Sequence, residues 1–172
     1  MLFRSGMDFI AEITFEKTDF TSLPSAAKEY ELCIFKSCDF SNCDLSNCKF
    51  IECEFSDCNL SLVKTGNTIL RDARFVNCKM IGIMFNACSN FGFSVAFTGC
   101  NLSHSSFYQK KMKGTGFKNS KLESVDFTEC DLANSVFENC DLQDAVFDRT
   151  ILSKSDLRTS FSFSIDRKST RL

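Results

Sequence analysis

A repeat of five residues constrains this chain more than any other feature. Residues 33–62 read as six consecutive units, CIFKS CDFSN CDLSN CKFIE CEFSD CNLSL, each of the form Cys-x-Phe/Leu-x-x. An α-helix repeats its faces every 3.6 residues and a plain strand every two, so neither fits a period of five. A short extended piece followed by a turn, repeated many times, does fit. In such a unit the first and third residues point inward, and the other three point outward or form the corner.

The third residue of the unit, its central position, is apolar along most of the chain. The pattern is visible at Phe15, runs through Phe85, slips by two residues within 86–94 and resumes at Phe97. Central residues 20 apart, or 22 apart across the slip, fall into columns. One column contains Phe15, Phe35, Phe55, Phe75, Phe97, Phe117 and Phe137, and another contains Phe85, Phe107, Phe127 and Phe147. Four units per turn therefore predict a four-sided tube in which phenylalanine rings stack in parallel.

The predicted fold is all-β, a quadrilateral β-helix of about seven coils that forms one domain over residues 1–172. Residues 23–32 contain the only proline and lose the pattern, so we expect a loop or short helix there. We expect a bulge or small corner loop at 86–94 and a frayed polar tail at 165–172. Some phenylalanines lie outside the register, at an end or at the slip, where we expect them to cover the open core: Phe3, Phe9, Phe91, Phe93, Phe161 and Phe163.

All 11 cysteines occupy the first position of a unit. Elsewhere this position holds mainly Ala, Ser, Thr or Val, so the shared property is small volume, and free cysteine behaves as a small buried hydrophobe. Metal and iron–sulfur sites need clustered spacings such as CxxC, which do not occur here. We therefore expect buried free thiols, no metal and no cofactor. The residues are Cys33, Cys38, Cys43, Cys48, Cys53, Cys58, Cys78, Cys88, Cys100, Cys130 and Cys140.

Charge and hydropathy exclude several classes of function. Lys and Arg total 20 against 22 Asp and Glu, a net charge of −2 that gives no general attraction to nucleic acid or anionic membranes. Charges at Arg4 and Asp8 precede any apolar run, so we expect no signal peptide. The longest uncharged run, residues 80–109, is too polar to span a bilayer. We expect a soluble protein of the reducing cytoplasm.

Charged residues are unevenly placed in the second half. No basic residue lies between Lys121 and Arg149, where the acidic residues are Glu123, Asp126, Glu129, Asp131, Glu138, Asp141, Asp144 and Asp148. They form either a DNA-like anionic surface that a partner binds or a solvated face that keeps the rod soluble. The preceding basic patch contains Lys110, Lys111, Lys113, Lys118 and Lys121 and lacks the aromatic residues of a nucleic-acid site. Lys110 falls on an inward position, so we expect the coil to distort there.

The repeat contains no recognisable arrangement of catalytic residues. His104, the single histidine, falls on an outward corner, and the repeat buries the cysteines, so no Ser-His-Asp or Cys-His arrangement can form. The seven glycines form no phosphate-binding loop. We expect a protein that is not an enzyme.

Several units match the motif A(D/N)LXX, with Cys or Ser replacing Ala. They are Cys38-Asp39-Phe40, Cys43-Asp44-Leu45, Cys58-Asn59-Leu60, Cys100-Asn101-Leu102, Cys130-Asp131-Leu132, Cys140-Asp141-Leu142 and Ser155-Asp156-Leu157. In these units the chain resembles the pentapeptide repeat family, which implies a right-handed quadrilateral β-helix. The Phe- and Cys-rich units are similar to the quinolone-resistance and microcin B17 immunity proteins, which protect DNA gyrase. The chain lacks the apolar C-terminal segment with which such proteins dimerise.

The resemblance implies a non-enzymatic interaction protein, a DNA mimic that binds DNA gyrase or topoisomerase IV and protects it from quinolones or toxins. Its contacts would be the acidic surface and the loop residues Asn90, Phe91 and Phe93, with no direct binding to nucleic acid or membrane. Two alternatives remain open at this stage. One is a structural or scaffold protein with an unrelated protein partner, and the other is a cysteine-based metal or redox protein.

Overall fold

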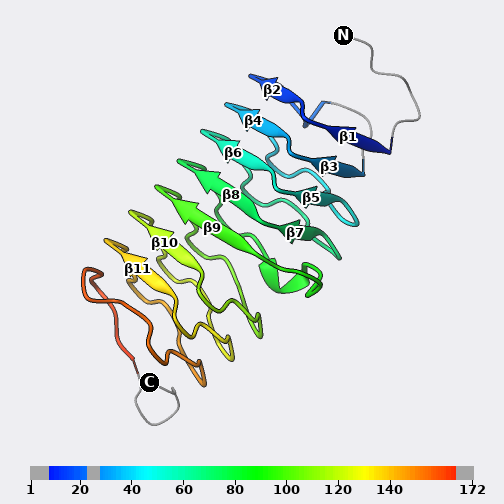
Figure 1. Cartoon of the computed structure of the whole chain (residues 1–172). Helices are drawn as coiled ribbons and strands as arrows, with labels where there is room; N and C mark the ends of the chain where they lie inside the picture. Colours follow the sequence, from blue (N-terminus) through cyan, green and yellow to red (C-terminus); the bar gives the residue numbers. More distant parts are fainter. Residues whose placement is uncertain (1–7, 23–27, 166–172) are drawn as a thin grey trace.

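The chain winds into a tube of stacked coils with β-strands along two of its sides (Figure 1). The structure is a computed structural model and describes residues 8–22 and 28–165. The smaller sheet contains β1 (Phe9–Ala11), β3 (Glu29–Glu31), β5 (Lys49–Ile51) and β7 (Ile69–Arg71). The larger sheet contains β2 (Thr14–Glu16), β4 (Ile34–Lys36), β6 (Glu54–Ser56), β8 (Ala73–Val76), β9 (Val95–Thr98), β10 (Gly116–Lys118) and β11 (Val136–Glu138).

Every strand pairs in parallel with the strand one coil away, and the register equals the predicted coil length. Phe35 pairs with Phe55, 20 residues on, and Phe75 pairs with Phe97, 22 residues on. Isolated parallel bridges such as Asp39 to Asn59 continue the ladders outside the strands. The predicted all-β quadrilateral β-helix is confirmed. Seven strands in the larger sheet correspond to six full turns from first to last, close to the predicted coil count.

The corners are formed by the residue two places after the central one, in the left-handed backbone region. Asn42 has φ 59° and Asp57 has φ 54°, for example. This conformation costs a non-glycine residue roughly 1–2 kcal/mol. Ladder hydrogen bonds hold it in place, as when the Asn42 N–H donates to the Ser61 carbonyl of the next coil at 3.0 Å.

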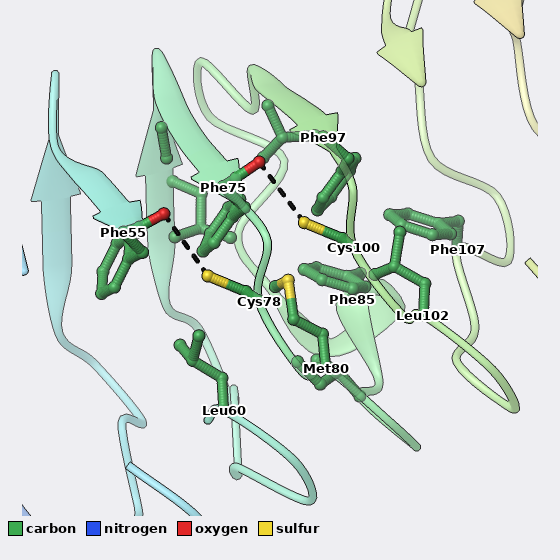
Figure 2. Packing of buried hydrophobic residues seen from close by; sticks show 14 of the residues in the cluster. Phe55, Leu60, Phe75, Cys78, Met80, Phe85, Phe97, Cys100, Leu102 and Phe107 are labelled. Carbon is green, nitrogen blue, oxygen red and sulfur yellow. Dashed lines mark hydrogen bonds between the residues drawn. The ribbon is translucent and has the colours of Figure 1, made fainter. Parts of the chain in front are cut away.

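Phenylalanine rings stack along the tube as predicted. Successive centroids in the column from Phe15 to Phe137 are 5.1, 4.6, 5.0, 5.4, 5.3 and 4.8 Å apart, with interplanar angles from 6° to 15°. The column from Phe85 to Phe147 has separations of 4.5, 5.4 and 5.2 Å. Rings of neighbouring columns meet edge to face, as Phe97 and Phe107 do at 5.9 Å. Figure 2 shows both columns beside Leu60, Met80 and Leu102. The core therefore contains an unbroken column of phenylalanine rings from Phe15 to Phe137, packed beside aliphatic side chains.

The cysteines point inward, and all are free. Ten are buried and Cys43 is half-buried. Small volume is only part of the reason for cysteine, because the thiols also donate hydrogen bonds. Cys78 Sγ donates to the Phe55 carbonyl and Cys100 Sγ to the Phe75 carbonyl, each at 3.3 Å (Figure 2). Thr150, at the same position of its unit, donates to the Phe127 carbonyl at 2.8 Å.

The thiols of Cys58, Cys78 and Cys100 complete the corners beside the larger sheet. Cys58 Sγ accepts from the Cys38 N–H at 3.4 Å and donates to the Phe35 carbonyl at 3.3 Å, so one thiol bridges both backbone groups of the corner below. At tighter corners the same two groups bond directly, as when Cys43 N–H donates to the Phe40 carbonyl at 2.9 Å.

The structure differs from expectation at residues 28–32 and at four off-register phenylalanines, since Phe9, Phe91, Phe161 and Phe163 are exposed. Residues 28–32 form a regular unit, with β3 and a buried Tyr30 stacked on Phe50 at 5.2 Å. The pattern was hidden because Lys28 replaces the small first residue and Tyr30 replaces phenylalanine. Residues 23–27, the tail after residue 165 and Phe3 lie outside the described residues. Among the off-register phenylalanines, Phe93 packs against the core, whereas Phe91 is exposed.

Candidate protein-interaction site

The tube departs from regularity at residues 88–94, which we call the bulge. A short 3₁₀-helix, η1 (Phe85–Ala87), precedes it and β9 follows it. The segment just before β9, green in Figure 1, projects beyond the corners of the neighbouring coils. Gly92 has φ 63°, the left-handed conformation of a corner, and Phe93 and Ser94 are the two extra residues of the coil.

Hydrogen bonds tie the bulge to the coil below. Ser89 N–H donates to the Thr68 carbonyl and Ser94 N–H to the Leu70 carbonyl, both at 2.9 Å. The Ser94 hydroxyl donates to Asp72 Oδ1 at 2.9 Å. Within the bulge, Phe91 N–H donates to Ser89 Oγ at 3.2 Å. The bulge therefore has a defined conformation.

Lys110 anchors the bulge from inside the tube. Its side chain lies at the first position of a unit and is 1% exposed. Its Nζ donates to the Cys88 carbonyl at 2.5 Å and to Asn90 Oδ1 at 2.8 Å, and lies 4.8 Å from the centre of the Phe93 ring. The coil at Lys110 itself is regular, because the Lys110 N–H donates to the Phe107 carbonyl at 2.9 Å. The predicted distortion at Lys110 is therefore wrong, and the departure from regularity lies one coil below, in the bulge.

The three predicted loop residues are brought together, with different roles. Phe93 is half-buried on the core, and the Asn90 side chain accepts from Lys110. Phe91 is 74% exposed, the largest exposure among the large apolar residues of the described chain. An exposed aromatic ring on a well-held backbone is the kind of residue that anchors protein interfaces. The sequence placed Lys110 in a basic patch and at an inward position, but it did not reveal the contacts of its ammonium with Asn90 and Phe93.

The acidic residues surround the tube. Asp126, Asp131 and Asp141 occur in three separate bridge ladders, and Glu138 lies in β11. Because consecutive units occupy consecutive sides, these ladders belong to different sides of the tube. The predicted acidic residues therefore form a band around one and a half coils.

Basic residues of nearby units neutralise much of this band. The ion pairs are Lys113–Asp131, Lys118–Glu138, Lys121–Glu123, Arg149–Glu129 and Arg149–Asp148, at 3.4, 3.1, 2.6, 2.9 and 3.1 Å. The hydrogen bond from Lys121 holds the pKa of Glu123 below its usual range. Within the described chain, Asp126, Asp141 and Asp144 take part in no ion pair.

Some of these carboxylates also have a structural task. Asp126 Oδ1 accepts the Thr128 N–H at 2.9 Å, and Asp131 Oδ1 accepts the Ala133 N–H at 3.2 Å. Asp39 and Asn59 make the same contact two residues on, at 2.8 and 3.1 Å. This bond is the physical reason why Asp or Asn precedes the central residue in so many units.

His104 is exposed at a corner with φ 62°. Over residues 8–22 and 28–165, no three His, Cys, Asp or Glu side chains are placed to hold a metal ion. In the same residues we find no helix with the length and apolar character that crossing a membrane requires.

The four-sided coil, the five-residue unit and the inward small donor define a pentapeptide repeat solenoid. The family profile described as "Pentapeptide repeat region" matches residues 28–91 and 92–161. The chain belongs to the pentapeptide repeat family.

The chain is similar to solved structures of pentapeptide repeat proteins. Full-length QnrB1, described as a plasmid-mediated fluoroquinolone resistance protein, is 20% identical, with a TM-score of 0.52 over 95% of this chain and 91% of QnrB1. HetL of the cyanobacterium Nostoc, involved in heterocyst differentiation regulation, is 15% identical, with a TM-score of 0.38 over 95% of this chain and 86% of HetL. The curated proteins contain no match.

Proposed function

We propose that this protein is a non-enzymatic interaction module whose partner is a type II topoisomerase, DNA gyrase or topoisomerase IV. The observation that carries the interaction role is the bulge, where Phe91 is 74% exposed on a backbone held by hydrogen bonds to the coil below. Because the rest of the tube is regular, the bulge is the feature that distinguishes one side of this rod from the others.

The choice of partner has two supports. The Phe- and Cys-rich units resemble those of proteins that protect gyrase, and the fold is similar to that of QnrB1. The acidic band supplies a second contact, since carboxylates on several sides of a rod resemble the phosphates around a duplex. In this proposal Asp126, Asp141 and Asp144 carry most of the attraction because they take part in no ion pair within the described chain.

A supercoiling assay tests the proposal. Purified gyrase is assayed with and without the protein, in the absence and presence of a fluoroquinolone. We expect the wild-type protein to change the fraction of gyrase activity that the fluoroquinolone inhibits. Phe91→Ala should raise the protein concentration needed for this change by about tenfold or more, as loss of an interface anchor does. Leu62→Ala is the matched control, because Leu62 is also apolar and 58% exposed but lies at a regular corner.

No effect of the wild-type protein at micromolar excess on either enzyme would remove the topoisomerase partner. Affinity capture that enriches a different protein, and loses it with Phe91→Ala, would favour the scaffold function instead. An equal loss of gyrase protection in Phe91→Ala and Leu62→Ala would contradict the role of the bulge.

A further inference from the structure

Lys110 occupies a position that the repeat gives mainly to small side chains. The residues stacked in its column are Cys88 below and Cys130 above, both buried. A lysine ammonium at 1% exposure is costly unless hydrogen bonds replace its water. Desolvation lowers the pKa of Lys110 from its ordinary value, while the thiols of Cys88 and Cys130 act in the opposite direction.

Every contact that compensates this burial is made with the bulge. The Lys110 ammonium donates to the Cys88 carbonyl and to Asn90 Oδ1, and it faces the Phe93 ring. These are two oxygen acceptors and one π face for three N–H donors. The contacts of Lys110 therefore stabilise the conformation of residues 88–93.

The geometry of these contacts determines where Phe91 lies. Asn90 and Phe93 are both drawn toward one nitrogen atom inside the tube, and only two residues connect them. Gly92, with φ 63°, reverses the chain between them, and the Arg71 side chain lies under it. The connecting residues must therefore pass outside, which leaves Phe91 exposed.

We propose that Lys110 is the positioning residue of the bulge, and that its buried ammonium holds Phe91 in the exposed conformation through Asn90 and Phe93. The conformational role of Lys110 is independent of any partner. Only the step from an ordered Phe91 to binding rests on the proposed function.

The conformational role is tested with Lys110→Met, which keeps the length of the side chain and removes its donors. The chain contains no tryptophan, so Phe91→Trp gives a single fluorescent reporter in the bulge. We expect Lys110→Met to lower the steady-state anisotropy of this introduced indole and to speed amide exchange at Ser89 and Ser94 by about tenfold. Exchange at Phe137 in β11, two strands beyond β9 in the larger sheet, should not change.

Leu122→Ala is the stability control, since Leu122 is fully buried away from the bulge. It should destabilise the fold and leave the anisotropy of the reporter unchanged. If Lys110→Met does not fold, Asn90→Ala is used instead, because it removes the side-chain oxygen that accepts one hydrogen bond from the Lys110 ammonium. This variant should loosen the bulge in the same way. Unchanged anisotropy and exchange in whichever of these two variants folds would overturn the proposal.

The gyrase assay separates this inference from the proposed function. Lys110→Met should lose protection to the extent that Phe91→Ala does. A loosened bulge together with a wild-type protein that has no effect on gyrase would overturn the proposed function and leave the role of Lys110 intact. Full protection by Lys110→Met despite a loosened bulge would overturn the link between Lys110 and binding.

Discussion

The Cys78 thiol donates a hydrogen bond to the carbonyl oxygen of Phe55, in the coil below, at 3.3 Å. It also donates to the carbonyl of Val76, two residues before it, at 3.4 Å. Sulfur is thus a polar group of the core as well as a filler of volume. The same arrangement at Cys58 and Cys100 makes this column a ladder of donors for buried carbonyls.

Replacing Cys78 distinguishes the donor role from simple volume. Cys78→Ala leaves the Phe55 carbonyl without its thiol donor, whereas Cys78→Ser keeps a hydroxyl like that of Ser160, which donates to the Phe137 carbonyl at 2.8 Å. We expect Cys78→Ala to be less stable than Cys78→Ser by about 1 kcal/mol, the typical net contribution of one intramolecular hydrogen bond. Chemical denaturation of both variants measures the difference. Equal or reversed stabilities would mean that volume alone selects cysteine.

Stability should fall at alkaline pH. Burial raises the pKa of Cys88 to about 11 and that of Cys130 to about 12. Hydrogen bonding to Cys100 and burial raise the pKa of Cys78 to about 12. Below about pH 8.5 these thiols are protonated in both the folded and unfolded states, so they add no pH dependence. Above it the unfolded chain releases protons first, and the stabilising contribution is lost progressively up to about pH 12.

Lys110 acts in the opposite sense, because its lowered pKa makes its deprotonation favour the folded state. Hydrogen bonds from neighbouring thiols lower the pKa of Cys33 and of Cys100, so these two cysteines act in the same sense as Lys110. The thiols with a raised pKa are more numerous, so the free energy of unfolding should still fall as pH rises. Urea midpoints measured at about pH 8, about pH 9.5 and about pH 10.5 follow the slope across the window in which the unfolded thiols ionise. A constant midpoint would contradict the expectation. A Lys110→Met variant should show a steeper fall than the wild-type protein.

The aromatic columns predict large costs for truncation. Phe75 stacks on Phe55 at 5.0 Å and on Phe97 at 5.4 Å, and it is buried. Phe75→Ala should destabilise the protein by about 3–5 kcal/mol through lost burial and a cavity. Phe91→Ala should change stability by less than about 0.5 kcal/mol because its ring is exposed. Thermal and chemical denaturation of the pair provide the measurement, and similar losses in both variants would refute this description of the core.

Two glycines at corners, Gly99 and Gly114, allow the energetic cost of the left-handed backbone conformation to be measured apart from the cost of a steric clash. Gly99 has φ 66°, and a Cβ there would collide with the Asn77 side-chain oxygen. Gly114 has φ 71°, but a Cβ there would meet open space. Gly114→Ala should cost about 1–2 kcal/mol, the penalty of the left-handed region alone. Gly99→Ala should cost more, and adding Asn77→Gly should recover the excess. A double-mutant cycle measures the coupling between the two positions.

The sequence predicts the inward residues because the period of five fixes the register of every unit. The columns from Phe15 and Phe85, the parallel ring stacking and the inward cysteines all follow from that register. Register does not specify hydrogen-bond partners, so the donor role of Cys58 or Cys78 became visible only in the structure. Tyr30 was missed for a different reason: its unit keeps the backbone path but not the residue types that reveal it.

The candidate site was predicted less completely. A slip of two residues locates the bulge, and Asn90, Phe91 and Phe93 were identified from that slip. Periodicity does not describe the path of extra residues, so it gave no reason for Phe91 to face outward and Phe93 inward. It assigned Lys110 to an inward position, but the partners of the ammonium come from the bulge, which has no repeat. The ion pairs of the acidic band could not be predicted either, because they are made by long flexible side chains whose conformations the register does not determine.

The Phe75 to Phe97 step crosses the bulge with a ring separation of 5.4 Å, within the range of the other steps in its column. The two added residues are thus absorbed at one corner without interrupting the aromatic column, while Phe93, one of the two, packs against the core beside Lys110. A peptide inserted between Phe91 and Gly92, which keeps Phe93 on the core, should consequently leave the remainder of the rod folded. The protein offers a ready-made display scaffold in which one corner accepts foreign sequence with little effect on the whole.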